Sequence, residues 1–297
     1  MKKFSFPQFR EKLIFYKLPL ILAAVLFLAV FCLWQNNYIT VSRYTVASEN
    51  LPENFDGFKI LQVSDLHNTY FGNSHSYIYG LMEHENPDII FVTGDIIDRR
   101  DTDFTCACIF LMACSDIAPT YCVSGNQESD TISPGDIMTI YEASGATVLD
   151  DKSTTIKKGG DSIRISGIAD KHYLFETDEE KEEILQENSS ANRTLRRVTK
   201  EGEFNILLAH RPEYYEMYEK AGADLVFCGH AHGGQIRLPF IGGLYAPVQR
   251  FFPKYTEGVH KLGEKTQMVI SRGLGNSRFP VRIFNHPEIS VITLKCK

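Results

Sequence analysis

The 297-residue sequence predicts an α/β protein that holds enough strands for two β-sheets and is preceded by one transmembrane helix. From residue 58 to residue 228, apolar runs of strand length alternate with segments of helical spacing, which is typical of an α/β domain. Residues 162–170, 266–275 and 288–295 resemble further strands, which makes the total enough for a second sheet. A charge-free apolar run of membrane-spanning length lies before all of them.

The N-terminal apolar run, residues 18–34, contains no charged side chain. At about 1.5 Å rise per residue, its helix nearly matches a hydrocarbon layer about 30 Å thick. Five basic residues and one acidic residue precede it. The positive-inside rule therefore predicts a single-pass protein of the cell membrane with a cytoplasmic N-terminus and an extracytoplasmic domain. A cleaved signal peptide is the alternative, although no convincing A-x-A cleavage site follows the run.

The expected organisation is a basic cytoplasmic tail at 1–17, a transmembrane anchor at 18–38, a linker at 39–54 and a single domain at 55–297. Because the formal net charge is -6 and the tail contributes +4, the rest of the chain carries -10. Such an acidic domain is poorly suited to binding the backbone of a long nucleic acid. The seven cysteines are odd in number and lie mostly in apolar segments, so we expect no disulfide framework.

The elements of the domain are expected in alternating order. The strands are near-continuous apolar runs that end in polar or glycine-rich turns, at 58–67, 87–98, 118–128, 204–210 and 224–232. Segments of helical spacing lie between them, at 74–85, 104–113 and 211–222. The segment 175–197, rich in Glu and Lys, is expected to be a solvated helix or a flexible insertion. We expect functional loops where the strands end.

Five of these strand ends carry carboxylate, amide or imidazole side chains. They are Asp65 and His67 in "SDLH", Asp95 in "GDIID", Asn126 in "GNQE", His210 in "LLAH", and His230 with His232 in "GHAHGGQ". One such residue alone is usually a turn or a helix cap, but burying so many without a cation costs several kcal/mol per ion. Seven donors exceed one tetrahedral zinc site. We therefore expect two metal ions, about 3.5 to 4 Å apart, that share a bridging carboxylate.

These motifs, in this order, resemble the calcineurin-like metallophosphoesterase family over roughly residues 58–297. The stretches "GHAHGGQIRLPFIGGLYAP" and "SRGLGNSRFPVRIFNHPEI" also resemble its bacterial membrane-associated phosphodiesterase and UDP-diacylglucosamine hydrolase-like subgroup. The resemblance implies a four-layer α-β-β-α sandwich. It also implies a ligand set, with Asp65, His67 and His232 on the first metal, Asp95 bridging, and Asn126, His210 and His230 on the second.

The activity expected from two such cations is hydrolysis of a phosphoester, of phosphodiesterase or pyrophosphatase type, by attack of a metal-bridging hydroxide. The ligand types suit Mn, Fe or Zn alike. The tether and the resemblance make a lipid-linked or cell-envelope phosphoester at the outer membrane face the expected substrate. A small-nucleotide phosphodiesterase and a metal-dependent phospho-ligand binding protein with little turnover remain alternatives, and the oligomeric state stays open.

One position departs from the family pattern. Gln127 stands in "GNQE" where most members have a His that resembles a general acid. Glutamine can donate a hydrogen bond but cannot deliver a proton, and general acid help is typically worth about 10²- to 10⁴-fold in rate. We therefore expect a substrate with a good leaving group or with its own acid, unless water supplies the proton. Arg211, and either Arg272 or Arg278, are candidate phosphate-binding residues.

Overall fold

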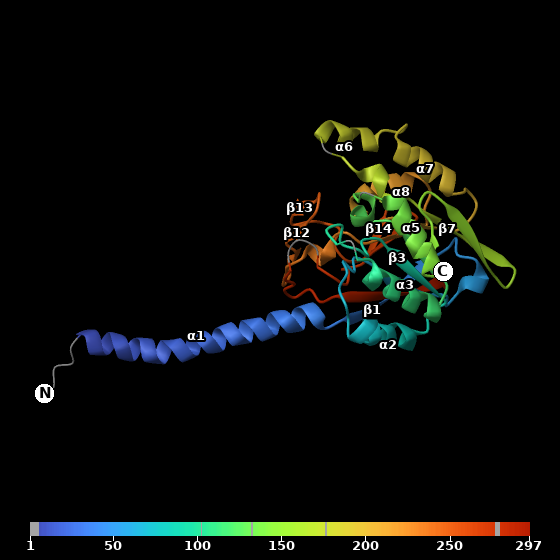
Figure 1. Cartoon of the computed structure of the whole chain (residues 1–297). Helices are drawn as coiled ribbons and strands as arrows, with labels where there is room; N and C mark the ends of the chain where they lie inside the picture. Colours follow the sequence, from blue (N-terminus) through green and yellow to red (C-terminus); the bar gives the residue numbers. More distant parts are fainter. Residues whose placement is uncertain (1–5, 102, 132, 176, 277–279) are drawn as a thin grey trace.

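Two six-stranded β-sheets pack face to face, and helices cover both outer faces (Figure 1). This computed structural model describes residues 6–297 except residues 102, 132, 176 and 277–279. The predicted four-layer α/β sandwich is therefore confirmed, as is an apolar helix in front of it. Short hydrophobic strands and amphipathic helices produce this layering because each must bury an apolar face against another element.

The first sheet has the strand order β1-β16-β2-β3-β4-β5. Its strands are β1 (Thr40–Ser48), β16 (Glu288–Cys296), β2 (Lys59–Val63), β3 (Ile89–Thr93), β4 (Thr120–Val123) and β5 (Thr147–Val148). Strands β2 to β5 run parallel, while β16 is antiparallel to β2. The outer face packs against α2 (Ser76–Glu85), α3 (Thr105–Ile117) and α5 (Pro134–Ala143) through buried residues such as Met82, Phe110 and Ile137.

The second sheet has the order β14-β15-β9-β8-β7-β6. Its strands are β14 (Gly258–Leu262), β15 (Thr266–Ile270), β9 (Leu225–Cys228), β8 (Asn205–Leu208), β7 (Asp161–Gly167) and β6 (Ser153–Lys158). Helices α7 (Ser190–Val198) and α8 (Tyr215–Lys220) cover it, with Leu195 and Met217 buried. The expected insertion at 175–197 thus forms α7 and a more exposed helix, α6 (Asp178–Leu185).

The central core lies between the two sheets. Phe91 of β3 meets Phe227 of β9 edge to face, with ring centroids 5.0 Å apart. Both strands are buried along their whole length, which explains why they read as continuous apolar runs. After β4 comes the single turn α4 (Asn126–Ser129), and after β9 come two hairpins, β10 (Arg237–Leu238) with β11 (Gly242–Gly243) and β12 (Tyr245–Ala246) with β13 (Arg250–Phe251).

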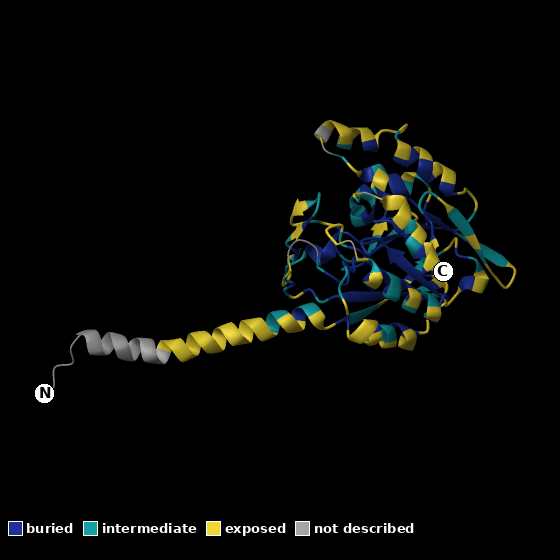
Figure 2. Ribbon diagram, in the orientation of Figure 1, coloured by how far each residue is buried: buried dark blue, intermediate teal, exposed yellow. Residues whose placement is uncertain are grey.

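Helix α1 (Phe6–Asn37) extends away from the domain, and its described side chains are exposed until its last turns (Figures 1 and 2). Its portion Lys17–Asn37 is long and apolar enough to cross a membrane, by length and composition. Residues 40–48, which lie within the linker expected at 39–54, form β1 and pair with β16 in parallel from Thr40↔Glu288 to Ser48↔Cys296. As an edge strand with mostly half-exposed side chains, β1 lacks the apolar pattern of the inner strands.

Candidate metal centre

The loops after β2, β3, β8 and β9 bring six of the seven predicted ligands into two buried groups. In each group, one ligand atom from every residue lies within 4.8 Å of the others. The first group is Asp65, His67 and His232, and the second is Asp95, His210 and His230. Because β2, β3, β8 and β9 all end at the same edge of the sandwich, residues far apart in sequence converge there.

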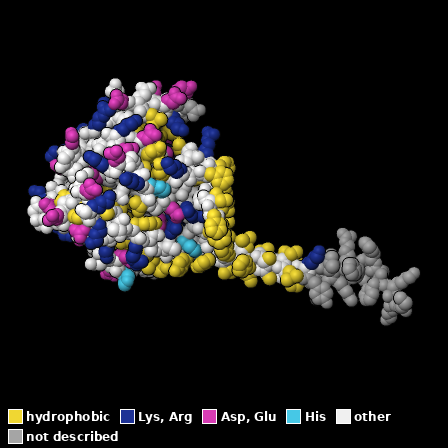
Figure 3. Space-filling model, turned by 180° about the vertical axis from the view of Figure 1, so that it is seen from behind, with side chains coloured by type: hydrophobic (Ala, Val, Ile, Leu, Met, Phe, Trp, Pro, Cys, Tyr) yellow, Lys and Arg dark blue, Asp and Glu magenta, His cyan; other side chains and the backbone are white. Residues whose placement is uncertain are grey.

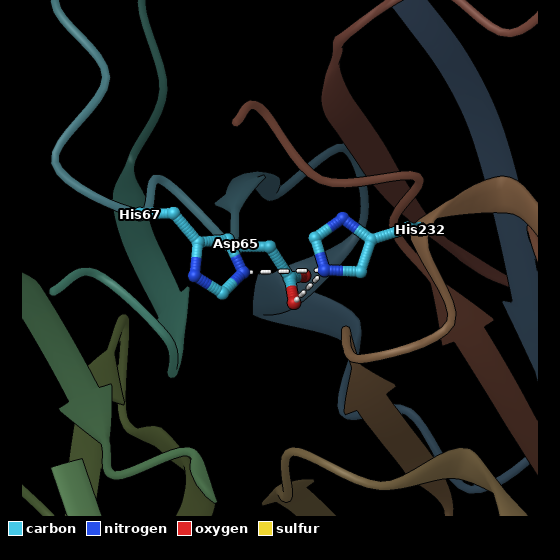
Figure 4. Close-up of side chains that lie close together, drawn as sticks. All are labelled: Asp65, His67 and His232. Carbon is cyan, nitrogen blue, oxygen red and sulfur yellow. Dashed lines mark hydrogen bonds and ion pairs between the residues drawn. The ribbon is translucent and has the colours of Figure 1, made fainter. Parts of the chain in front are cut away.

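The first group consists of a carboxylate facing two imidazoles (Figure 4). Nε2 of His232 lies 3.4 Å from Asp65 Oδ1 and 3.2 Å from Nε2 of His67. The backbone N–H of His230 donates to both oxygens of Asp65 at 3.1 Å, which fixes the carboxylate. Ring nitrogens and carboxylate oxygens that all converge on one point are the arrangement that a cation would complete.

Asp95 lies between the two groups. Its Oδ2 is 3.4 Å from Nε2 of His210 in the second group and 3.7 Å from Nε2 of His67 in the first. The other oxygen, Oδ1, accepts a hydrogen bond from the backbone N–H of Gln127 at 2.8 Å, which orients the carboxylate. The carbonyl of Thr93 accepts from Nδ1 of His210 at 2.7 Å, so Nε2 is the nitrogen free to act as a ligand. This is the position that a shared carboxylate requires.

The backbone around these ligands is held in an unusual conformation. Positive φ angles of 46° to 66° occur at five of the seven predicted ligands, Asp65, His67, Asp95, His230 and His232. Each left-handed non-glycine residue costs about 1–3 kcal/mol, and such strain gathers at functional sites. Glycines allow the close approach: a Cβ on Gly125 would lie 2.2 Å from Asp95 Oδ1, and one on Gly229 would lie 2.5 Å from Asp65 Oδ2.

Burial and mutual charge set the protonation of the group. Burial, together with the neighbouring Asp95 carboxylate, raises the pKa of Asp65 to about 7, although the imidazole of His210 opposes this shift. Burial opposes the ionisation of Asp95 as well, but the imidazoles of His210 and His67 hold its pKa well below the usual range. Burial would lower the pKa of His210, yet the Asp95 carboxylate raises it to about 10. The raised pKa keeps a proton on the imidazole of His210. A divalent cation would replace the positive charge of that proton and relieve the repulsion between the carboxylates of Asp65 and Asp95.

Several buried donor atoms of the site lack hydrogen-bond partners and suit divalent metal ions. Oδ1 of Asn126 is buried and has no hydrogen-bond partner in the described part of the chain, as is also true of Nδ1 of His67 and Nε2 of His230. An unpaired buried amide oxygen is costly, and a cation would satisfy it. Asn126, the seventh predicted ligand, begins α4 and lines the same cavity as Asp95 and His230. Carboxylate, amide oxygen and imidazole together suit Mn, Fe or Zn.

A cavity of about 290 Å³ opens over the two groups. Its lining includes Gln127, and also Arg99, which sequence analysis missed although it follows Asp95 in the same loop. Arg99 forms an ion pair with Asp130, and its backbone N–H donates to Oε1 of Gln127 at 3.2 Å. A larger cavity, of about 650 Å³, lies by α6 and α7, and the predicted ligands do not line it.

Two glutamates with buried carboxylates lie beside the site and were not singled out from the sequence. Glu128 accepts hydrogen bonds from the backbone N–H groups of Asp95 at 2.9 Å and Gly125 at 2.8 Å. Both carboxylate oxygens of Glu213 lack a hydrogen bond among the described residues, and Oε1 lies 3.8 Å from Nε2 of His230. The only signal in the sequence was position, since Glu128 closes "GNQE" and Glu213 stands three residues after His210.

Two of the arginines expected to bind phosphate, Arg211 and Arg272, do not line this cavity. Arg211 makes a two-pronged ion pair with the buried Asp170, at 2.8 and 2.9 Å, and it is not part of the cavity lining. Arg272 pairs with Glu257 and Glu288. Arg278 lies outside the described residues. Within the described part of the chain, Arg99 is therefore the arginine that lines the cavity.

Comparison with known proteins gives a consistent match. The family model described as calcineurin-like phosphoesterase matches residues 58–234. The uncharacterized metallophosphoesterase YkuE of Bacillus subtilis is 33% identical, over 88% of this chain and 87% of its own. The phosphodiesterase YaeI of Escherichia coli is 27% identical, over 82% and 84%. A Danio rerio transmembrane protein with a metallophosphoesterase domain is 25% identical, over 83% of this chain and 55% of its own.

Proposed function

We propose, from the premise that the chain belongs to the calcineurin-like phosphoesterase family and is a hydrolase of phosphoester bonds, that it is a dinuclear phosphodiesterase tethered to a membrane. One observation carries this proposal. Oδ2 of Asp95 lies within 3.7 Å of an imidazole nitrogen in each of two buried ligand groups, so a single carboxylate can serve two cations. The name of the relative YaeI favours a diester over a monoester.

In this proposal, two divalent cations are held by three ligands each and by Asp95 in common. The first set is Asp65, His67 and His232, and the second is Asn126, His210 and His230. When bound, such cations supply charge stabilisation at the phosphoryl oxygens and water acidic enough to ionise near neutral pH. Mn, Fe and Zn all fit these ligands, and manganese is the ion with which we would begin.

The protein residues contribute orientation. The N–H of Gln127 fixes one oxygen of Asp95, the carbonyl of Thr93 fixes the tautomer of His210, and Glu128 ties the loop of Asp95 to the loop of Gly125. Because Oε1 of Gln127 accepts from the N–H of Arg99, the amide nitrogen of Gln127 is the group able to donate to a phosphoryl oxygen. No proton for the leaving group comes from Gln127, which favours substrates whose leaving group is a weak base.

Anchoring of the domain to a membrane narrows the range of proposed substrates further. The apolar portion Lys17–Asn37 of α1 would anchor the chain, with residues 1–17 in the cytoplasm, 18–38 in the bilayer and the domain at 55–297 outside, joined to the anchor through β1. The Danio rerio relative is named a transmembrane protein, which supports an anchor. We therefore propose a lipid-linked or cell-envelope phosphoester, as in UDP-diacylglucosamine hydrolase-like members of the family, over a soluble nucleotide.

The test uses the full chain in detergent, stripped of metal and reloaded with Mn²⁺. Hydrolysis of an activated aryl phosphodiester and of the matching monoester is measured for the wild type and for Asp95→Asn. We expect metal-dependent turnover with preference for the diester, and a loss of about 10²-fold or more in the variant. Two bound metals without turnover would instead indicate a phospho-ligand binding protein, and a preference for the monoester would reject the phosphodiesterase.

A further inference from the structure

The two hairpins beside the metal centre expose large apolar side chains to solvent. Phe240 between β10 and β11 is fully exposed, and Phe251 and Phe252 at β13 are 68% and 63% exposed. Together with Ile241 and Phe284, these residues form what we call the apolar rim. Side chains of this kind are normally buried, and an exposed apolar patch marks an interaction site.

The rim is one connected surface. The carbonyl of Leu244, between the two hairpins, accepts from the backbone N–H of Phe252 at 2.9 Å, and the N–H of Leu244 donates at 2.8 Å to the carbonyl of Ile236, just before the first hairpin. The N–H of Arg237, at the start of the first hairpin, donates at 2.9 Å to the carbonyl of Ile283, the residue before Phe284. The hairpins and the 283–284 segment are therefore held together by backbone hydrogen bonds, and they can meet one partner as a unit.

The rim continues into α1. The ring of Phe284 packs against Phe31 of α1, with centroids 5.8 Å apart, and His286 packs against Trp34 at 4.7 Å. Because Phe31 and Trp34 belong to the apolar portion of α1, the rim begins at the level of the membrane-spanning segment. Strands β12 and β13 lie on the side of the domain toward which α1 extends (Figure 1), and hydrophobic side chains form a band along that side (Figure 3).

Charge near the rim differs from that of the domain as a whole. Residues 237–257 contain three basic side chains and one acidic one. Arg237 is paired with Glu257, and the exposed Arg250 and Lys254 remain beside the rim, whereas residues 18–297 together carry a formal charge of -10. Basic residues flanking exposed aromatics are suited to an anionic lipid surface. A second copy using the same surface would bring two basic segments together, which is unfavourable.

We propose that the apolar rim docks on the lipid bilayer in which α1 is anchored, giving the domain a second contact with that membrane. This inference rests on the proposed anchoring by α1 and deepens the proposed function, because Tyr245 and Pro247 of the second hairpin also line the metal cavity. Docking places the mouth of the cavity at the headgroup layer. A phosphoester in a lipid headgroup then reaches the metal centre without leaving the bilayer.

The test exploits Trp34, the single tryptophan of the chain. In a Trp34→Phe background, one tryptophan is introduced at the rim, as Phe240→Trp or Phe251→Trp, in two separate variants. The matched control is Met112→Trp, because Met112 on α3 is also 54% exposed but lies on the outer face of the first sheet. Each full-length protein is reconstituted in phosphatidylglycerol and phosphatidylcholine vesicles, and quenching by brominated phosphatidylcholine and by aqueous iodide is measured.

Docking predicts that brominated lipid quenches both rim tryptophans about two- to threefold more than the control, and iodide quenches them less, since a docked apolar face lies about 5–10 Å into the headgroup boundary. Equal quenching of rim and control by iodide, without quenching by brominated lipid, would overturn the proposal. Protection from both quenchers would also overturn it, and would assign the rim to a second copy of the chain. The fluorescence measurement requires no hydrolysis. A negative quenching result would therefore reject docking of the rim without affecting the phosphodiesterase proposal, and absence of turnover would not affect the docking proposal.

Discussion

Replacing Glu128 with Gln is predicted to abolish most of the activity although Glu128 is not among the proposed metal ligands. The carboxylate accepts four backbone hydrogen bonds, from Asp95 at 2.9 Å, Ile96 at 2.7 Å, Ile97 at 3.3 Å and Gly125 at 2.8 Å. It also accepts from the hydroxyl of Tyr141 at 2.9 Å. These bonds join the loop that presents Asp95 to the loop that presents Asn126, so Glu128 acts as a positioning residue.

The size of the effect follows from those bonds. A hydrogen bond to a charged group contributes about 1.5–3 kcal/mol, and an amide offers one acceptor oxygen where the carboxylate offers two. Glu128→Gln therefore loses at least one strong hydrogen bond, and the new side-chain NH₂ group faces backbone N–H groups that are themselves donors. We expect the free energy of unfolding to fall by about 3 kcal/mol. A displacement of Asp95 by about 1 Å would reduce turnover by about 10²-fold.

The assay combines urea unfolding, metal content and hydrolysis of an aryl phosphodiester. Tyr141→Phe is the matched control, because it removes one hydrogen bond to Oε1 of the same carboxylate and leaves the bond from the N–H of Asp95 to Oε2 in place. We expect the control to lose about 1 kcal/mol of stability and little turnover. A folded Glu128→Gln protein with wild-type turnover would refute the reasoning, as would equal losses of turnover in the two variants.

Three further predictions follow from the same geometry. Gln127→His should raise turnover on an alkyl phosphodiester by about 10-fold or more relative to an aryl one; an unchanged ratio would reject the leaving-group argument. Gly125→Ala places a Cβ 2.2 Å from Asp95 Oδ1 and should lower metal content and turnover in a protein that still folds, whereas wild-type kinetics would contradict the geometry. Burial opposes ionisation of Asp151, but hydrogen bonds from His172 hold its pKa at about 2, below the usual value of 3.8 for an aspartate. Since the folded pKa is the lower one, this stabilisation is complete above pH 4 and disappears as the pH falls through 2, so Asp151→Asn should remove about 1 kcal/mol of acid-dependent unfolding free energy in that window; identical acid unfolding curves would count against it.

The inner strands and the ligand-bearing turns could be predicted from the sequence because both depend on local pattern. Strands β3 and β9 are buried on both sides and read as continuous apolar runs, each followed at once by its polar turn. The edge strand β1 could not be predicted in this way. Its partner β16 lies about 250 residues later, and its half-exposed alternation resembles that of a polar linker.

The residues that support the site could not be predicted from the sequence for a related reason. Glu128 and Glu213 are identified by what surrounds them, namely backbone N–H groups from another loop in one case and the imidazole of His230 in the other. The partner of Arg211 could not be predicted either, because Asp170 comes from a distant segment and accepts two hydrogen bonds from the guanidinium group. The sequence also could not distinguish the exposed aromatics of the rim from core residues, since exposure depends on what packs nearby.

The central claim is that two cations share Asp95, and the metal content of the protein tests it most directly. Full-length protein is loaded with Mn²⁺, freed of excess metal and analysed by mass spectrometry for metal per chain, beside Asp95→Asn and His260→Gln. His260 is a suitable control because it lies on β14 and belongs to neither ligand group. We expect two metal ions per chain in the wild type and in the control, and fewer than one in Asp95→Asn. Two ions retained by Asp95→Asn, or a single ion in a fully active wild type, would contradict it.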